Sequence, residues 1–459
     1  MLRTHTCNEA TDALIGQQVT LAGWVSNRRD HGGIIFIDLR DRYGITQIVF
    51  DPKDDKTAWE EANTYRSEYV IQIQGKIRAR PDGQANPRLN TGKIEVIISQ
   101  THLISESKTP PFEIDDHGQL PNEDIRFKYR FIDLRRKKVQ ENVVFRSKFI
   151  HMTRNWFHEN LFTEVQTPLF TVSSPEGARD YLIPSRINPG KFYALPQAPQ
   201  QYKQLLMVGG LDKYFQIAPC FRDEDPRADR HACEFYQIDC EMSFVEQKDV
   251  FNVVEKYLRA AVGSMSDKKI VDDTFYEMTY DESLENYGTD KPDLRFGMKF
   301  VDLTDVFAGS AFSVFKSVHE NGGVIKAIKL EGQIMSRGDI DTLTQTAQKA
   351  GAKGLAYIIY DPVEGPRSPI LKFFSDAEKA ELEKRLEPKA GDMIFFSADE
   401  FKKAVSTLSI VRLALRDKFT LADKKKLAFC WIKDFPMFEQ DEKTGKLDFS
   451  HNPFSMPIG

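Results

Sequence analysis

The stretch FRDEDPRADRHACEFYQIDCEMSFV runs from Phe221 to Val245 and joins two strand-like segments through a charged loop. Such a pair predicts an antiparallel hairpin with a long charged tip. A solvated hairpin would be enough to explain the loop itself. However, Arg222, Glu224, Asp239 and Glu241 lie inside or at the ends of apolar strands, where an unpaired charge is costly. We therefore expect these charges to have partners or a ligand.

The composition is that of a globular protein of two to four domains, with 459 residues, 41% hydrophobic and 29% charged. The formal net charge of -5 gives no global basic field, so binding of nucleic acid would depend on local patches. The five cysteines form no C-x-x-C pair, which argues against a zinc site and favours a reducing compartment. We find no signal peptide and no apolar run of the ~18 residues needed to span a bilayer. The predicted location is the cytoplasm, with no membrane partner.

Residues 1–105 contain five short strand-like segments separated by turns, and as many acidic as basic residues. Five such strands predict a small β-barrel, for which the oligonucleotide-binding (OB) fold is one candidate. The segments are QVTLAGWV, GIIFIDLRD, TQIVFD, EYVIQIQGKIRAR and KIEVIISQTHLIS.

The second of these segments carries an aromatic residue on its polar side. Because side chains alternate between the faces of a strand, Ile35, Ile37 and Leu39 share the natural core face. Phe36 then lies on the other face beside Asp38, where it could stack on an unpaired base. Alternatively, a loop or a neighbouring domain covers Phe36.

The rest of the chain divides into four parts. Residues 106–138 predict a Pro-containing linker, and 139–292 predict a long helix followed by a strand that stops at Pro168. Residues 293–422 change in character and predict an inserted α+β module. The pattern that precedes this module resumes over 423–459.

Two further segments place polar residues where a substrate could bind. SSPEGARDYLIP presents Glu176 in a loop punctuated by Gly and Pro. In FYALPQAPQQYKQLLM, Gln200 and Lys203 are three residues apart at the start of an apolar helix, so both can face one pocket.

The hairpin resembles motif 2 of the class II aminoacyl-tRNA synthetases in its aspartyl form, which begins Phe-Arg-x-Glu as do Phe221 to Glu224 here. The helix, strand and Pro168 resemble motif 1, which builds the dimer interface in that family. The insertion resembles that of the bacterial type. The resemblance implies an OB-fold anticodon-binding barrel, an antiparallel α+β catalytic domain in two parts (139–292 and 423–459) and an inserted GAD-like α+β domain (293–422). It also implies a homodimer.

In this family, ATP and Mg²⁺ activate the amino acid, which is then attached to tRNA. An arginine can hold a phosphate oxygen and a carboxylate together, and Arg222 matches the catalytic one; a structural salt bridge is the alternative. Lys203 matches the lysine that binds the aspartate side chain, although alone it could be a solvated helix residue. The implied aspartate-binding residues are Glu176, Gln200, Lys203, Arg222, Asp239 and His451. The implied ATP-binding residues are Arg222, Asp223, Glu224, His231 and Phe235.

The sequence departs from the family pattern in three places. Asn452 replaces the second histidine of His-His-Pro-Phe, and HACEF is one residue longer than the usual loop, so His231 is only the nearest match to an ATP-contacting glutamine. The third motif is not found before Gly459. We therefore expect the catalytic domain to be incomplete at its C-terminus, the Mg²⁺ ligand to lie beyond residue 459, and the 1–459 chain to have little or no activity.

The implied RNA partner is tRNA(Asp), with Arg29, Phe36 and Gln47 matching the anticodon-contacting positions. The loop from His31 to Gly33 resembles that of members that also charge tRNA(Asn), a question that the sequence leaves open. The alternatives to an aspartate–tRNA ligase are an asparaginyl-tRNA synthetase, which should not place Lys203 against a neutral amide, and a non-catalytic tRNA-binding protein.

Overall fold

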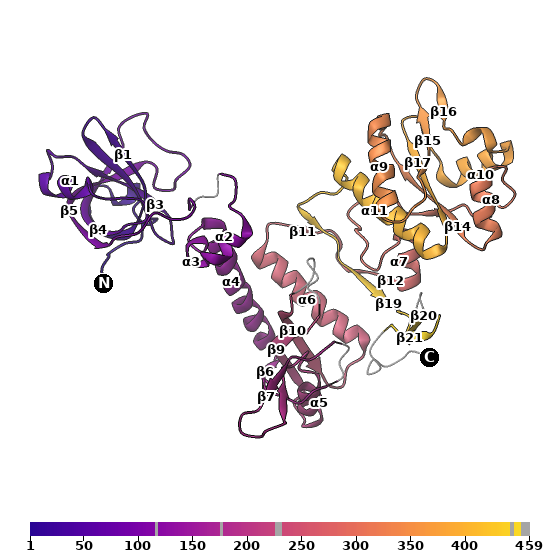
Figure 1. Cartoon of the computed structure of the whole chain (residues 1–459), viewed down its shortest axis with the longest axis horizontal. Coiled ribbons are helices and arrows are strands. Elements are labelled where there is room, and N and C mark those ends of the chain that lie inside the picture. Colours follow the sequence, from indigo (N-terminus) through magenta and orange to yellow (C-terminus); the bar gives the residue numbers. More distant parts are fainter. Residues whose placement is uncertain (115–117, 175–177, 225–231, 441–444, 451–459) are drawn as a thin grey trace. The chain divides into compact units, whose positions relative to one another are not determined.

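The structure is a computed structural model that describes residues 1–114, 118–174, 178–224, 232–440 and 445–450. The chain divides into two compact units, Met1–His151 and Met152–Gly459. Figure 1 shows their elements in the order of the sequence. Each unit is described by itself.

The first unit contains a closed five-stranded barrel with the strand order β1-β2-β3-β5-β4. All neighbouring pairs are antiparallel except β3 and β5, which are parallel. A short helix, α1, follows β3. The elements are β1 (Gln18–His31), β2 (Ile34–Arg40), β3 (Ile45–Phe50), α1 (Lys56–Ala62), β4 (Val70–Ala79) and β5 (Ile94–Ser105). The predicted OB-fold barrel is confirmed.

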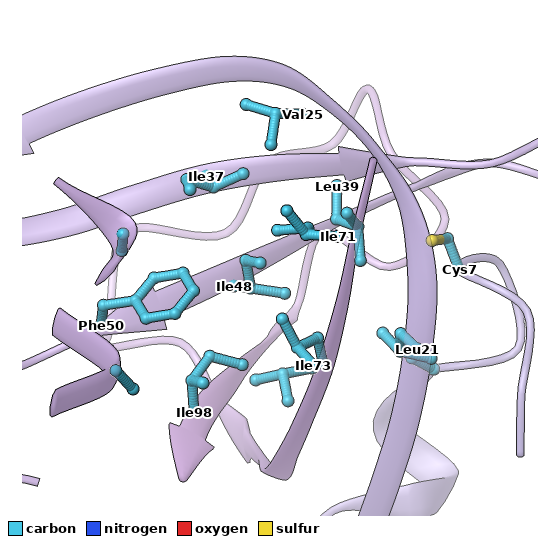
Figure 2. Packing of buried hydrophobic residues seen from close by; sticks show 14 of the residues in the cluster. Cys7, Leu21, Val25, Ile37, Leu39, Ile48, Phe50, Ile71, Ile73 and Ile98 are labelled. Carbon is cyan, nitrogen blue, oxygen red and sulfur yellow. The ribbon is translucent and has the colours of Figure 1, made fainter. Parts of the chain in front are cut away.

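The face of β2 that alternation assigned to the core points into the barrel. Ile35, Ile37 and Leu39 are fully buried, whereas Phe36 and Asp38 between them stay partly exposed. Figure 2 shows Ile37 and Leu39 among apolar side chains from the other strands. The alternation of side chains therefore predicted both the core and the polar face of this strand.

Three helices follow the barrel strands, namely α2 (Glu123–Lys128), α3 (Arg130–Asp133) and α4 (Lys137–Glu159). Their buried charge is Asp133, which has no exposed surface. Arg126, Arg130 and Arg136 all donate to its carboxylate, at 3.1, 2.8 and 3.2 Å. Burial alone would raise the pKa of Asp133, but the hydrogen bonds from Arg126 and Arg136 lower it.

A second buried carboxylate, Glu68, connects the barrel to the segment after α3. Arg40 of β2 donates to both of its oxygens at 2.7 and 2.8 Å, and Arg135 donates to Oε2 at 2.7 Å. The guanidinium of Arg135 also lies over the ring of Trp24, 5.0 Å from its centroid. The Glu68 side chain is only 3% exposed. Because both cations depend on this one anion, removing it would leave two largely buried positive charges.

The second unit begins with a sheet of order β10-β9-β6, in which β9 and β10 form the predicted antiparallel hairpin. The elements of this part are β6 (Thr163–Glu164), β7 (Leu182–Pro184), β8 (Phe192–Ala194), α5 (Gln200–Val208), β9 (Lys213–Phe221), β10 (Glu234–Met242) and α6 (Gln247–Met265). The hairpin is continuous in register from Phe221↔Glu234 to Lys213↔Met242.

A five-stranded sheet of order β13-β14-β17-β15-β16 forms a three-layer module in the same unit. Helices α9 and α11 pack on one face of the sheet and α8 and α10 on the other (Figure 1). The elements are β13 (Val301–Asp302), α8 (Ser313–Glu320), β14 (Val324–Leu330), α9 (Arg337–Lys349), β15 (Ala356–Asp361), β16 (Gly365–Arg367), α10 (Asp376–Leu386), β17 (Met393–Asp399) and α11 (Phe401–Phe419).

Segments on either side of this module pair with each other in parallel, β11 with β18 and β12 with β19. Helix α7 contacts α11 closely: a Cβ on Gly288, the residue that ends α7, would lie 2.1 Å from the carbonyl oxygen of Val405. The elements are β11 (Lys269–Ile270), β12 (Tyr276–Thr279), α7 (Tyr280–Tyr287), β18 (Lys426–Leu427), β19 (Cys430–Lys433), β20 (Phe438–Gln440) and β21 (Leu447–Phe449). The boundaries of the five domains proposed from the sequence stay a prediction.

The Glu68 network predicts a large effect of a small substitution. We expect Glu68→Gln to lower the free energy of unfolding of the barrel by about 3 kcal/mol, because Arg40 and Arg135 lose their anion. Urea titrations monitored by hydrogen exchange of the barrel amides measure this loss of free energy. The control is Glu60→Gln, which removes an exposed pair with Lys56 and should cost less than about 0.5 kcal/mol. Equal effects of the two variants would contradict the prediction.

Candidate active site

The β9–β10 hairpin places polar side chains from both strands on one face of the sheet. Asp239 pairs with Gln216, and Glu241 pairs with Tyr214. Directly paired residues share a face, and so do residues two apart on one strand. These four side chains therefore form one polar surface on the hairpin.

Lys203 of α5 binds this surface through its ammonium group. Nζ lies 2.7 Å from Oδ1 of Asp239 and 2.9 Å from Oε1 of Glu241. The side chains of Lys203 and Asp239 are each 12% exposed. Burial alone would lower the pKa of Lys203, but the ion pairs with both carboxylates outweigh it and raise the pKa. The lysine is therefore held protonated inside the site.

One oxygen of this cluster has no partner. Oδ2 of Asp239 is buried and accepts no hydrogen bond from the part of the chain that the structure describes. A buried carboxylate oxygen without a donor is costly. An ammonium group of a small ligand is the kind of donor that would satisfy it.

Arg222 follows β9 directly and is held on three sides. Its backbone N–H donates to the carbonyl oxygen of Cys233 at 2.8 Å, and its Nε donates to the carbonyl oxygen of Gln197 at 3.5 Å. Its guanidinium lies over the ring of Phe235, 5.1 Å from the centroid. The structure thus brings Arg222 and Phe235 together, as a site for a flat, anionic ligand requires.

Three other predicted residues of this site lie in α5 and directly after Arg222. Gln200 begins α5 on the side of Lys203. Asp223 is exposed, and its N–H donates to the carbonyl oxygen of Arg179 at 2.9 Å, while Glu224 is partly buried. The predicted residues Glu176, His231 and His451 lie outside the described residues.

Sequence reasoning missed Gln197, which organises the loop near the site. Its side chain is almost fully buried and accepts from the N–H of Ala178 at 3.0 Å. It also donates to the carbonyl oxygens of Ser174 and Ala178 and to the carboxylate of Asp180. No local pattern in the sequence marks this role, because the contacts of Gln197 form only when the loop folds around it.

On the barrel, the three predicted base-contacting residues share the polar face. Arg29 pairs with Phe36 across β1 and β2, and Gln47 pairs with Asp38 across β2 and β3. Nη2 of Arg29 donates to Oδ1 of Asp38 at 3.0 Å and to Oε1 of Gln47 at 3.5 Å. Burial raises the pKa of Asp38 against the opposing effect of Arg29. This surface combines a partly exposed ring with a guanidinium, which suits an unpaired base.

Gln47 is mostly buried, and its position on this face is fixed by a residue that the sequence did not indicate. Its amide Nε2 donates to Oε2 of Glu95 at 2.9 Å, and Arg78 donates to Oε1 of Glu95 at 2.8 Å.

Among the described residues, no three or more His, Cys, Asp or Glu side chains gather so as to hold a metal ion. Within the described ranges, no helix is long and apolar enough to cross a membrane.

The chain resembles known proteins along its full length. Residues 122–459 match the family described as tRNA synthetases class II (D, K and N), and residues 19–104 match the OB-fold nucleic acid binding domain. The aspartate–tRNA(Asp/Asn) ligase of Prosthecochloris aestuarii is 47% identical over 458 residues, covering 100% of this chain and 75% of that protein. The same ligase of Aquifex aeolicus is 47% identical over 455 residues, covering 99% of this chain and 75% of that protein.

Among solved structures, the asparaginyl-tRNA synthetase of Pyrococcus horikoshii with asparaginyl-adenylate has a TM-score of 0.53 at 19% identity. The match covers 90% of this chain and 97% of that one. At this identity the likeness concerns the fold alone.

Removal of Lys203 should destabilise the protein. In Lys203→Met, Asp239 and Glu241 would face each other without a cation, which we expect to lower the free energy of unfolding by about 3 kcal/mol. Urea titrations at pH 7 measure this loss. Lys213→Met, on the opposite face of the hairpin, is the control, and equal losses in the two variants would count against the ion pairs.

Proposed function

The chain belongs to the class II tRNA synthetases, and from this premise we propose that it attaches L-aspartate to the 3′ end of tRNA(Asp) with the use of ATP. The first step forms aspartyl-adenylate and releases pyrophosphate. The second step transfers the aspartyl group to a terminal ribose hydroxyl of the tRNA and releases AMP. The observation that carries the proposal is the buried ammonium of Lys203 beside Asp239, whose Oδ2 has no donor among the described residues.

The charges of this cluster match those of aspartate. Lys203 has three N–H donors and gives two of them to Asp239 and Glu241. The third is available to the side-chain carboxylate of the substrate. Oδ2 of Asp239 would accept from the substrate ammonium. In this arrangement the ammonium and the side-chain carboxylate of the substrate each meet a largely buried group of opposite sign.

Activation requires two anions to react. An oxygen of the substrate α-carboxylate attacks the α-phosphorus of ATP, and the bond to the bridging oxygen breaks as pyrophosphate leaves. Positioning and cationic stabilisation matter most in such a transfer. We assign this role to Arg222, whose planar fork can bind the carboxylate and the phosphate together. Adenine would stack on Phe235, next to the guanidinium of Arg222.

The other residues suggested by the family resemblance complete the proposal. Asp223, Glu224 and His231 would contact ATP. Glu176, Gln200 and His451 would contact the aspartate. Mg²⁺ would neutralise the phosphates of ATP when bound.

The barrel would bind the anticodon through Arg29, Phe36 and Gln47, which share one face. We include tRNA(Asn) as a second RNA substrate, because the similar ligases are named for both tRNAs. Assembly as a homodimer through the segment around Pro168 and a cytoplasmic location stay predictions.

Substrate choice tests the function directly. By titration calorimetry, the chain should bind L-aspartate at least about tenfold more tightly than L-asparagine, because a carboxylate accepts a stronger hydrogen bond from the third N–H of Lys203 than a neutral amide does. Lys203→Met should abolish this preference, and Lys213→Met should retain it. Tighter binding of L-asparagine would support an asparaginyl-tRNA synthetase instead. Binding of tRNA with neither amino acid would support a non-catalytic tRNA-binding protein.

The barrel surface gives a second test. Phe36→Ala should weaken the binding of tRNA(Asp) by about 1–3 kcal/mol through the loss of base stacking. Filter binding at fixed salt measures the Kd. The control is Tyr43→Ala, which removes an exposed aromatic ring at the turn after β2. An unchanged Kd for Phe36→Ala would exclude stacking on this ring.

A further inference from the structure

Three side chains on and beside the polar surface of the hairpin have no role in the proposed reaction. They are Tyr214 and Gln216 of β9 and Thr167, which follows β6. Tyr214 is fully buried and Gln216 is 3% exposed. The hydroxyl of Tyr214 donates to Oε1 of Gln216 at 2.7 Å, and the hydroxyl of Thr167 donates to the same oxygen at 3.1 Å.

This group lies against Asp239. Gln216 pairs directly with Asp239 across the hairpin, and Tyr214 pairs with Glu241. Burial raises the pKa of Tyr214, and the charge of Asp239 raises it further. The raised pKa keeps the phenol protonated at neutral pH, where it acts as a hydrogen-bond donor.

The hydrogen bonds give the group a defined geometry. Two hydroxyl donors converge on one amide oxygen, so the orientation of the Gln216 side chain and the rotation of both hydroxyls are specified together. Hydrogen bonds in a buried network of this kind restrict the rotation of the side chains that make them. The strands hold their backbones in place as well, because β6 pairs with β9 next to Tyr214.

We propose that Tyr214 and Gln216, held by Thr167, are positioning residues for Asp239. They fix the carboxylate so that Oδ1 stays on Lys203 and Oδ2 is left for the ammonium group of the amino-acid substrate. This inference rests on the proposed function, since it assumes that an amino acid binds at Asp239. Lys203 alone binds only one of the two carboxylate oxygens. The direction of the other oxygen therefore depends on rigid side chains beside the carboxylate.

Tyr214→Phe tests the proposal, with Tyr257→Phe as a matched control. Tyr257 is also a buried tyrosine of the second unit, and its hydroxyl lies 2.8 Å from that of Thr153. In calorimetric titrations of the 459-residue chain, Tyr214→Phe should raise the Kd for L-aspartate by about five- to tenfold, as expected for the loss of one buried hydrogen bond near a charge. The Kd for ATP should change by less than about twofold. Tyr257→Phe should change neither Kd.

A second pair of variants separates positioning from a general loss of structure. Thr167→Val removes the hydroxyl at nearly constant volume and should weaken L-aspartate binding, whereas Thr167→Ser keeps the hydroxyl and should restore it. An unchanged Kd for L-aspartate in Tyr214→Phe, or a parallel rise in the Kd for ATP, would overturn the proposal. If the unmodified chain does not bind L-aspartate, the proposed function fails and this inference fails with it.

Discussion

The pairing of β9 with β10 in one uninterrupted register is the constraint on which the candidate site depends. The register sets Asp239 opposite Gln216 and Glu241 opposite Tyr214. A slip of one residue would turn every side chain of one strand to the other face of the sheet. Lys203 would then lose both carboxylates, and Asp239 would lose its neighbours Tyr214 and Gln216 on the same face. The chemistry of the site is thus a property of strand alignment as much as of residue identity.

Three of the buried ions follow one rule: each has its counterions within hydrogen-bonding distance. Asp133 has three arginines, Glu68 has two, and Lys203 has two carboxylates. Such clusters contribute little net stability compared with apolar packing, but each becomes strongly destabilising when one member is removed. They specify which segments meet. Oδ2 of Asp239 departs from this rule at the place where we expect a ligand.

Local patterns predicted much of the fold. The alternation of Ile35, Ile37 and Leu39 gave the barrel core, and two apolar runs flanking a charged loop gave the hairpin. The barrel core and the hairpin depend on residues that are close together in the sequence, so local patterns can predict them. The shared face of Arg29, Phe36 and Gln47 was indicated by family resemblance and not by pattern.

The partners of buried polar groups could not be predicted in this way. Glu95 contacts Gln47 from 48 residues away, and Lys203 reaches Asp239 across 36. No local pattern marks such contacts, because they form only when the strands and helices pack. The same holds for Gln197 and Tyr214, whose importance lies in what they contact. Lys203 was expected to face a substrate, and the structure adds that it is already bound by two internal carboxylates.

The network around Glu68 has a consequence for where the barrel can be separated from the rest of the chain. All the strands of the barrel end by Ser105, yet one of the two cations on Glu68 is Arg135, about thirty residues further on. A fragment cut after Ser105 would leave Glu68 with Arg40 alone and would uncover the face of Trp24 against which Arg135 lies. We therefore expect a fragment that keeps the Glu68 ion pairs to extend at least to Arg135. Its boundary is set by electrostatics and not by the end of the sheet.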